Sequence, residues 1–162
     1  MKKKEEESFF QQFIRHSEHF WIRDNIAIYR AFEELSSLIP DAYKKSIAKS
    51  GGVVFIRAHN ELAASFSSPV RENIILIYPD LITMLNRFDP SEGIAVLAHE
   101  LGHIIFKHSH RNISNIDAQI EADRFASIIG LKKPLISVLK KYEMTLEVKT
   151  RIKNLALINS KV

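Results

Sequence analysis

The sequence predicts a single α+β domain, with helices before and after a small sheet along the chain. Three observations support this prediction. Apolar residues recur at helical spacing up to Pro40, two apolar runs rich in β-branched residues occupy 53–56 and 73–78, and helical spacing returns after Pro79. The 162 residues, of which 46% are hydrophobic, are enough to bury one core of ordinary size.

The first 50 residues are expected to be helical. Residues 5–20 place phenylalanine and isoleucine at near-helical spacing, which predicts an amphipathic helix. A second helix is expected to start near Asp24 and to stop at Pro40, where the chain cannot continue a helix. A third is expected over 41–49, ended by the glycine pair 51–52.

After the glycines the pattern changes to that of a sheet. Strands are predicted at Val53–Ile56 and Asn73–Tyr78, because both runs are apolar and rich in β-branched residues. Leu62–Phe66 is a further candidate strand, of lower β-propensity because it contains two alanines. Because three such runs occur, we expect a small mixed or antiparallel sheet of about three strands.

The rest of the chain is expected to be helical. Pro79 opens one helix, since proline is favoured at the first helical position. A second runs from about Ser91 to His108, and a third from Asn115 to the glycine at position 130. Two more follow over 134–142 and 146–158. The expected single domain, residues 1–162, thus has a helical N-terminal part (1–50), a part with the sheet and central helices (52–130) and a helical C-terminal part (131–162).

Composition narrows the class of protein. There is no cysteine, so a disulfide-stabilised domain is excluded and a metal site would need histidine and carboxylate ligands. The basic start has no apolar core of a signal peptide behind it, and no run approaches the ~20 apolar residues of a membrane span. We therefore expect a cytoplasmic location. The net charge of +4 comes largely from lysines near the C-terminus, which we interpret as solvated helix faces, so no nucleic-acid partner is expected.

The segment with the clearest chemistry is His99-Glu100-Leu101-Gly102-His103. Positions four apart on a helix lie roughly 40° apart around the axis, so His99 and His103 share one face and can bind one zinc ion. Glu100 is suited to take a proton from a water on the metal. Gly102 is expected to be small because a facing helix must come close at this turn. A catalytic zinc site uses three protein ligands and an open position, so a third ligand is expected from the next helix.

The acidic segment of that next helix is Asp117-Ala118-Gln119-Ile120-Glu121-Ala122-Asp123. Together with the H-E-x-x-H motif, and with the run that follows to Ala126, it resembles the gluzincin metallopeptidases. The nearest branches are the M48 family, which includes the HtpX-like proteases, and the ImmA/IrrE-like (M78) peptidases. The resemblance covers roughly residues 52 to 158 and implies a zincin-type active-site helix packed against the sheet. It also implies that Asp123 orients a zinc-binding histidine and that an extended peptide binds along the Leu62–Phe66 strand.

One position departs from the resemblance. In these families the metal-binding glutamate usually stands four residues before the aspartate, and here that position is Gln119. Two residues on, Glu121 points about 200° around the helix from Gln119. We take Glu121 as the third ligand, on a rotated or shifted helix, with Asp123 and Gln119 beside the ligands. Two alternatives stay open: Gln119 in the ligand position, which weakens the site because an amide is a poor zinc ligand, and Asp117 as the ligand.

These residues predict a zinc-dependent metalloendopeptidase that binds one Zn²⁺ per chain. Its catalytic residue is Glu100, its metal ligands are His99, His103 and Glu121, and its partners are peptide or protein substrates. The competing hypothesis is a weakly active or inactive metallopeptidase-like module with a binding or regulatory role, suggested by Gln119. The sequence leaves the oligomeric state and the substrate open.

Overall fold

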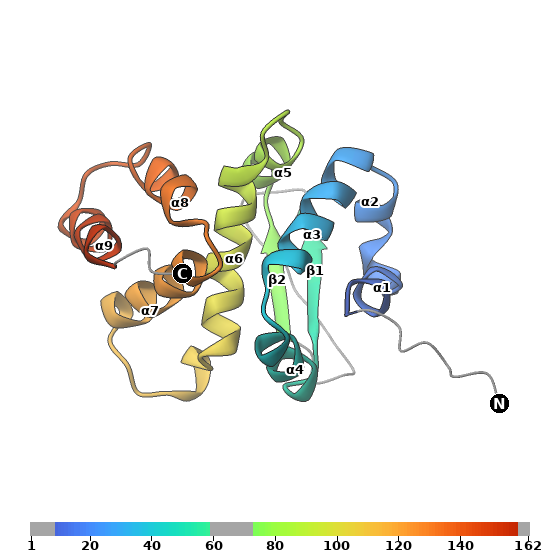
Figure 1. Ribbon diagram of the computed structural model, residues 1–162, viewed down its shortest axis with the longest axis horizontal. Helices are drawn as coiled ribbons and strands as arrows, with labels where there is room; N and C mark the ends of the chain where they lie inside the picture. The colour runs from blue at the N-terminus through green and yellow to red at the C-terminus, as the bar shows by residue number, and fades with distance from the viewer. Residues whose placement is uncertain (1–8, 59–72, 159–162) are drawn as a thin grey trace.

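A computed structural model describes residues 9–58 and 73–158 of the chain. The described part is mostly helical and contains a small parallel sheet of two strands. Along the chain, helices come first, then the strands, then helices again, as the sequence predicts. Figure 1 shows the sheet and the N-terminal helices on one side of the long helix α6 (Ser91–Ile105), and helices α7 to α9 on its other side.

The N-terminal region contains four helices and a short 3-10 turn. These elements are α1 (Phe9–Ile14), η1 (Ser17–His19), α2 (Phe20–Arg23), α3 (Ile26–Leu38) and α4 (Asp41–Lys49). The single helix predicted over 5–20 is therefore interrupted within its described part. His16 has a non-helical backbone, with φ of -55° and ψ of 137°, and its side chain accepts a hydrogen bond from the Glu18 amide, which interrupts the helix and starts the turn. Asn25 caps α3 by accepting from the amides of Ala27 and Ile28.

The two strands, β1 (Val53–Arg57) and β2 (Asn73–Ile77), pair in parallel with Val53 opposite Asn73. A purely antiparallel sheet is therefore wrong, because sequence propensity indicates a strand but not the direction of its partner. The expected strand at Leu62–Phe66 lies outside the described residues, so a third strand and a mixed sheet stay predictions. The Asn73 side chain donates to the Gly52 carbonyl, which joins the start of β2 to the turn before β1.

Helix α5 (Pro79–Leu85) begins at Pro79 as predicted and leads into α6. Helix α6 is buried over most of its length, with apolar side chains on almost every face. It packs against α3, α4 and α5 on one side and against α7 and α8 on the other. Side chains from the helices on both sides can therefore contact α6.

Helix α6 ends at Ile105, earlier than the predicted end at His108. Lys107 adopts the left-handed conformation, with φ of 54°, and this turns the chain out of the helix. His108 then begins a 3-10 turn, η2 (His108–His110), instead of continuing the helical face. The turn brings the His108 ring back to His103.

Three helices complete the described chain: α7 (Asn115–Ile128), α8 (Lys132–Leu139) and α9 (Leu146–Leu157). Helix α7 ends before Gly130, which has a positive φ as the predicted helix end requires. Helix α7 packs closely on α6, because Gly102 has no side chain to keep Ala122 away. Across the described ranges 9–58 and 73–158, every helix is too short or too polar to cross a lipid bilayer.

Candidate active site

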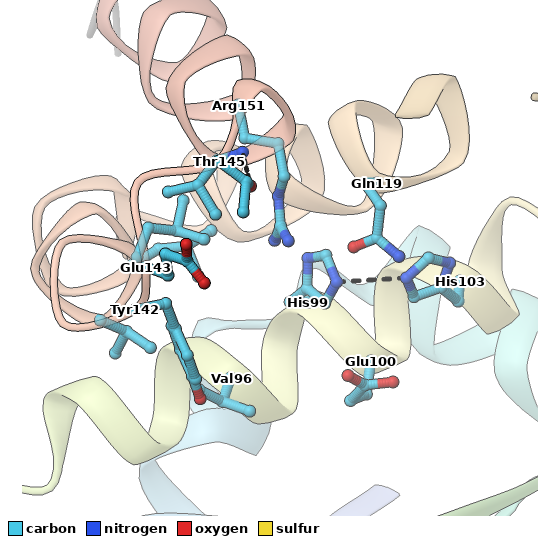
Figure 2. Close-up of a pocket in the computed structure, with 13 residues that line it drawn as sticks. Val96, His99, Glu100, His103, Gln119, Tyr142, Glu143, Thr145 and Arg151 are labelled. Atoms are coloured by element: carbon cyan, nitrogen blue, oxygen red, sulfur yellow. Dashed lines mark hydrogen bonds between the residues drawn. The ribbon is translucent and has the colours of Figure 1, made fainter. Parts of the chain in front are cut away.

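His99 and His103 lie one turn apart on α6, and their rings converge. The two Nε2 atoms are 3.1 Å apart, and a dashed line marks this contact in Figure 2. The His99 side chain is buried and that of His103 is half-buried. Burial, and after it the neighbouring histidines, lower the pKa of His103 to about 4, so this ring is neutral near pH 7.

A carboxylate and an arginine lie behind His99. Its Nδ1 atom is 2.8 Å from Asp123 Oδ1, close but without the alignment of a hydrogen bond. Arg151 of α9 donates two hydrogen bonds of 2.8 Å to the same carboxylate. Burial favours a raised pKa for Asp123, but the hydrogen bonds from Arg151 and the contact with His99 outweigh it and hold the pKa below its usual value. Asp123 is therefore an ionised group that favours a proton on His99 Nδ1.

Behind His103 lies a longer chain of side chains. His103 Nδ1 is 2.7 Å from His108 Nδ1, and His108 Nε2 is 3.0 Å from Glu121 Oε2. Arg111 donates to both oxygens of Glu121, at 2.6 and 3.2 Å. The hydrogen bonds from Arg111 and His108 lower the pKa of Glu121 to about 2. Glu121 is therefore ionised. Its carboxylate contacts His108 and Arg111, on the Nδ1 side of the His103 ring and away from His99.

These contacts leave the two Nε2 atoms as acceptors that face each other. A carboxylate lies against Nδ1 of His99, and Nδ1 of His103 lies 2.7 Å from Nδ1 of His108. A neutral ring with its proton on Nδ1 has a lone pair on Nε2. Two lone pairs 3.1 Å apart repel each other unless a positive centre lies against both. The pair therefore fits a cation, and neutral imidazole is a preferred ligand of zinc.

The two histidines line a pocket of about 520 Å³ with Glu100, Gln119 and Tyr142. A second hollow, of about 490 Å³, runs along β2 and is also lined by Glu100, His103 and Tyr142. The first hollow extends toward α8 and α9, and the second toward the sheet. Glu100 and His103 thus lie where the two hollows meet.

Helix α7 presents Gln119, not Glu121, to this pocket. Figure 2 shows the Gln119 side chain pointing toward the two imidazoles. Glu121 and Asp117 do not line the pocket. Asp117 is exposed and accepts a hydrogen bond of 2.6 Å from Ser114, at the start of α7. Glu121 as a metal ligand therefore stays a prediction.

Besides the two imidazoles and the amide of Gln119, the carboxylates of Glu100 and Glu143 line this pocket. Over residues 9–58 and 73–158, no cluster combines three or more histidine, cysteine, aspartate or glutamate side chains in a metal-binding arrangement. The described donor set thus fits a cation through His99 and His103, with the neutral amide of Gln119 as the third group at hand. An amide oxygen binds zinc more weakly than a carboxylate does.

Two arginines of this arrangement are not singled out by the sequence pattern. Arg151 stands 28 residues after Asp123, and Arg111 lies in the loop between η2 and α7. The only sequence signal for Arg151 is the resemblance of the C-terminal segment around it to the same families. For Arg111 no signal exists, because its partner depends on where the chain turns after α6.

The comparison with family models finds one match. Residues 30–153 match the model of peptidase family M48, and this range includes the described elements from most of α3 to most of α9. The chain therefore belongs to peptidase family M48. No curated protein and no solved structure shows a significant match to it. Membership supports a peptidase, and the members of this family are generally metallopeptidases that use zinc.

Proposed function

We propose that this chain is a zinc-dependent metalloendopeptidase whose reacting groups are His99, Glu100 and His103. The observation that supports it most is the pair of Nε2 acceptors 3.1 Å apart, in the same pocket as Glu100. Membership of family M48 supports the same class of activity. The substrate is then a polypeptide that lies across the two hollows that meet at Glu100.

In this proposal His99 and His103 hold the zinc ion, and Gln119 occupies the third ligand position. Of the three candidates on α7, Gln119 is favoured because it shares the pocket with both imidazoles. Zinc, when bound, polarises a carbonyl group and makes water more acidic. Because a neutral amide replaces a carboxylate, we expect a lower affinity for zinc than in a site with three strong ligands.

The protein itself supplies proton transfer and positioning. Glu100 takes a proton from the water that attacks the peptide carbonyl and passes it to the leaving amine. Its carboxylate lines both hollows, so it can reach a bond held between them. Asp123 and Arg151 hold the His99 ring from behind, which keeps Nε2 directed at the metal position.

A second candidate function rests on one observation, the amide at the third ligand position. If Gln119 reduces zinc affinity below the concentration of available zinc, the chain binds polypeptides in the same cleft without cleaving them. The protein is then a binding or regulatory module of the peptidase family. In both functions the cleft binds a polypeptide. They differ in whether the chain holds zinc and whether it cleaves the bound polypeptide.

The test measures zinc content and peptide cleavage on purified full chain supplied with zinc. The wild type is expected to bind one zinc ion and to cleave an unfolded protein substrate. Glu100→Gln should keep the zinc and lose roughly 100-fold or more in cleavage, the usual contribution of a general base. Gln119→Glu should bind zinc more tightly and cleave faster.

Asp117→Asn is the matched control on α7, since Asp117 is exposed and paired with Ser114. It should match the wild type in both measurements. If the wild type binds no zinc and cleaves nothing, and Gln119→Glu gains both properties, the peptidase proposal is rejected in favour of the binding module. Cleavage that survives Glu100→Gln would exclude the proposed mechanism.

A further inference from the structure

We infer that Glu121 is a positioning residue that acts on His103 through His108, and that it does not bind the metal itself. The inference rests on the proposed function, since it concerns how the His103 ligand is prepared. It assigns a role to three side chains, those of His108, Glu121 and Arg111, that form a cluster behind the pocket. Its basis is the order of donors and acceptors in this cluster.

The order begins at Arg111, which can only donate hydrogen bonds. It donates to both carboxylate oxygens of Glu121, so Glu121 is fixed as an ionised acceptor. The Oε2 atom of Glu121 lies 3.0 Å from His108 Nε2, and a carboxylate there requires the proton on this nitrogen. An imidazole whose single proton lies on Nε2 has a lone pair on Nδ1.

The same logic extends to His103. Its Nδ1 atom is 2.7 Å from the Nδ1 atom of His108, which can only accept. The proton of His103 must therefore lie on Nδ1, and the lone pair on Nε2 faces the metal position. If His108 had the other tautomer, its Nδ1 proton would force the His103 proton onto Nε2. The ligand atom would then be blocked.

The backbone and packing hold His108 in the place that this role requires. The left-handed Lys107 ends α6 and turns His108 back toward the helix. The His108 side chain is only 7% exposed and its ring stacks on Phe106, with ring centroids 5.9 Å apart. Arg111 also donates to the Phe106 carbonyl at 3.3 Å, which fixes the loop relative to the end of α6. Glu121 and His108 therefore meet at a site built by two elements, α7 and η2.

The two histidines of the pocket are thus held in similar ways. Behind each one lies a carboxylate that an arginine anchors: Asp123 with Arg151 for His99, and Glu121 with Arg111 for His103. The difference is that His108 is inserted between Glu121 and His103. By this comparison the Glu121 carboxylate is occupied by His108 and Arg111. The third ligand position is then left to Gln119.

The first test reads the tautomer of His103 directly, by nitrogen-15 NMR of the metal-free full chain at neutral pH. In the wild type the proton is expected on Nδ1. His108→Leu removes the acceptor, and Glu121→Gln offers His108 an amide that can donate instead. Both variants should shift His103 toward a mixture of tautomers. Asp117→Asn, the control on α7, should leave the tautomer as in the wild type.

His108→Asn is the conservative variant, because its side-chain oxygen can accept from His103 near the position of the lost Nδ1. It should restore the Nδ1 tautomer that His108→Leu loses. In the His108→Asn background, Glu121→Gln should have no further effect on His103. A wild-type His103 that carries its proton on Nε2, or a tautomer unchanged in both His108→Leu and Glu121→Gln, would overturn the inference.

The second test is a double-mutant cycle on zinc affinity, measured by chelator competition. Outer groups that orient a metal ligand are worth about 10–100-fold in affinity, so each single variant should weaken zinc binding by about this factor. If Glu121 acts only through His108, the double variant is no weaker than His108→Leu alone. Effects that multiply would identify Glu121 as a ligand in its own right and overturn the inference.

Failure of this inference is distinguishable from failure of the proposed function. The NMR measurement needs neither zinc nor cleavage, so it decides the role of Glu121 even if the wild type proves inactive. Conversely, the wild type could bind zinc and cleave peptides while the two substitutions have multiplicative effects on zinc affinity. That result would support the proposed function and reject the positioning role of Glu121.

Discussion

At the scale of single residues, Gly102 decides how close α7 comes to the face of α6 that carries His99 and His103. A Cβ atom at this position would lie 2.8 Å from Ala122 Cα and 3.0 Å from the Ala122 carbonyl oxygen. Both atoms belong to backbone, so they cannot move aside as a flexible side chain can. The glycine at this position predicts that the facing helix comes close at this turn, and the close approach of α7 confirms it.

We expect Gly102→Ala to destabilise the protein by about 1–3 kcal/mol, the usual cost of overpacking, despite the better helix propensity of alanine. Gly93→Ala is the matched control on the same helix. There the new Cβ would lie 3.0 Å from the Leu85 side chain, which can shift, and 3.1 Å from the Leu85 backbone nitrogen, both farther than the 2.8 Å to backbone at Gly102. Urea unfolding should show the larger loss for Gly102→Ala. Equal losses would mean that the distance between α6 and α7 is not set by Gly102.

The residues of the site differ in how far sequence predicts them. Helical spacing places His99 and His103 on one face, and it also separates Gln119 from Glu121 around α7. What spacing does not give is which of these two faces the histidines, because that depends on the rotation of α7 about its axis. The role of His108 depends on the left-handed Lys107, a conformation that a lysine rarely adopts and that its sequence context does not signal.

At the scale of elements, the predicted bounds agree with the structure where a residue with a backbone role marks the end. Pro40 and Pro79 separate or open helices, and Gly130 follows the end of α7. The predicted bounds are wrong where a local hydrogen bond or a backbone angle interrupts an apolar pattern, as at His16 and Lys107. Periodicity reports which face is buried, and it does not register such breaks.

His19 links the N-terminal helices to the sheet. It is fully buried, its Nε2 accepts from the Phe55 amide at 3.0 Å, and its Nδ1 lies 2.8 Å from the Phe13 carbonyl oxygen. Nδ1 therefore donates, and the ring is neutral in this arrangement. Burial lowers the pKa of His19 to about 4, whereas an unfolded histidine has a pKa of about 6.5.

This difference predicts a loss of stability in acid. The unfolded state takes up the proton first, so the contribution of His19 is present above about pH 6.5 and is lost as the pH falls toward 4. Between pH 7.5 and pH 5 the wild type should lose about 2 kcal/mol more than His19→Gln, whose side-chain oxygen can still accept from Phe55. Urea unfolding at both pH values, with a chelator present, measures this. Parallel losses in the two proteins would exclude His19 as the source.

At the scale of the whole molecule, the C-terminal helix α9 reaches back to the centre of the fold through Arg151. The Arg151 side chain is 12% exposed and that of Asp123 only 2% exposed, so the pair is largely removed from water. The pair connects α9 to α7, and Asp123 in turn touches His99 on α6. The geometry of the pocket therefore depends on a segment that follows the H-E-x-x-H motif by about fifty residues of chain, and Arg151 lines the pocket itself.

Removing one partner of this pair should be costly, because the other is then a buried charge without compensation. We expect Arg151→Met to lower the free energy of unfolding by about 3–5 kcal/mol. Lys141→Met is the matched control, since Lys141 is 53% exposed and pairs with Glu92 at the surface, where such pairs contribute about 0–1 kcal/mol. Denaturant unfolding at pH 7 in the presence of chelator compares the two variants. If both lose the same small amount, Asp123 must find water or another donor when Arg151 is absent, and α9 is then not required to hold His99 in place.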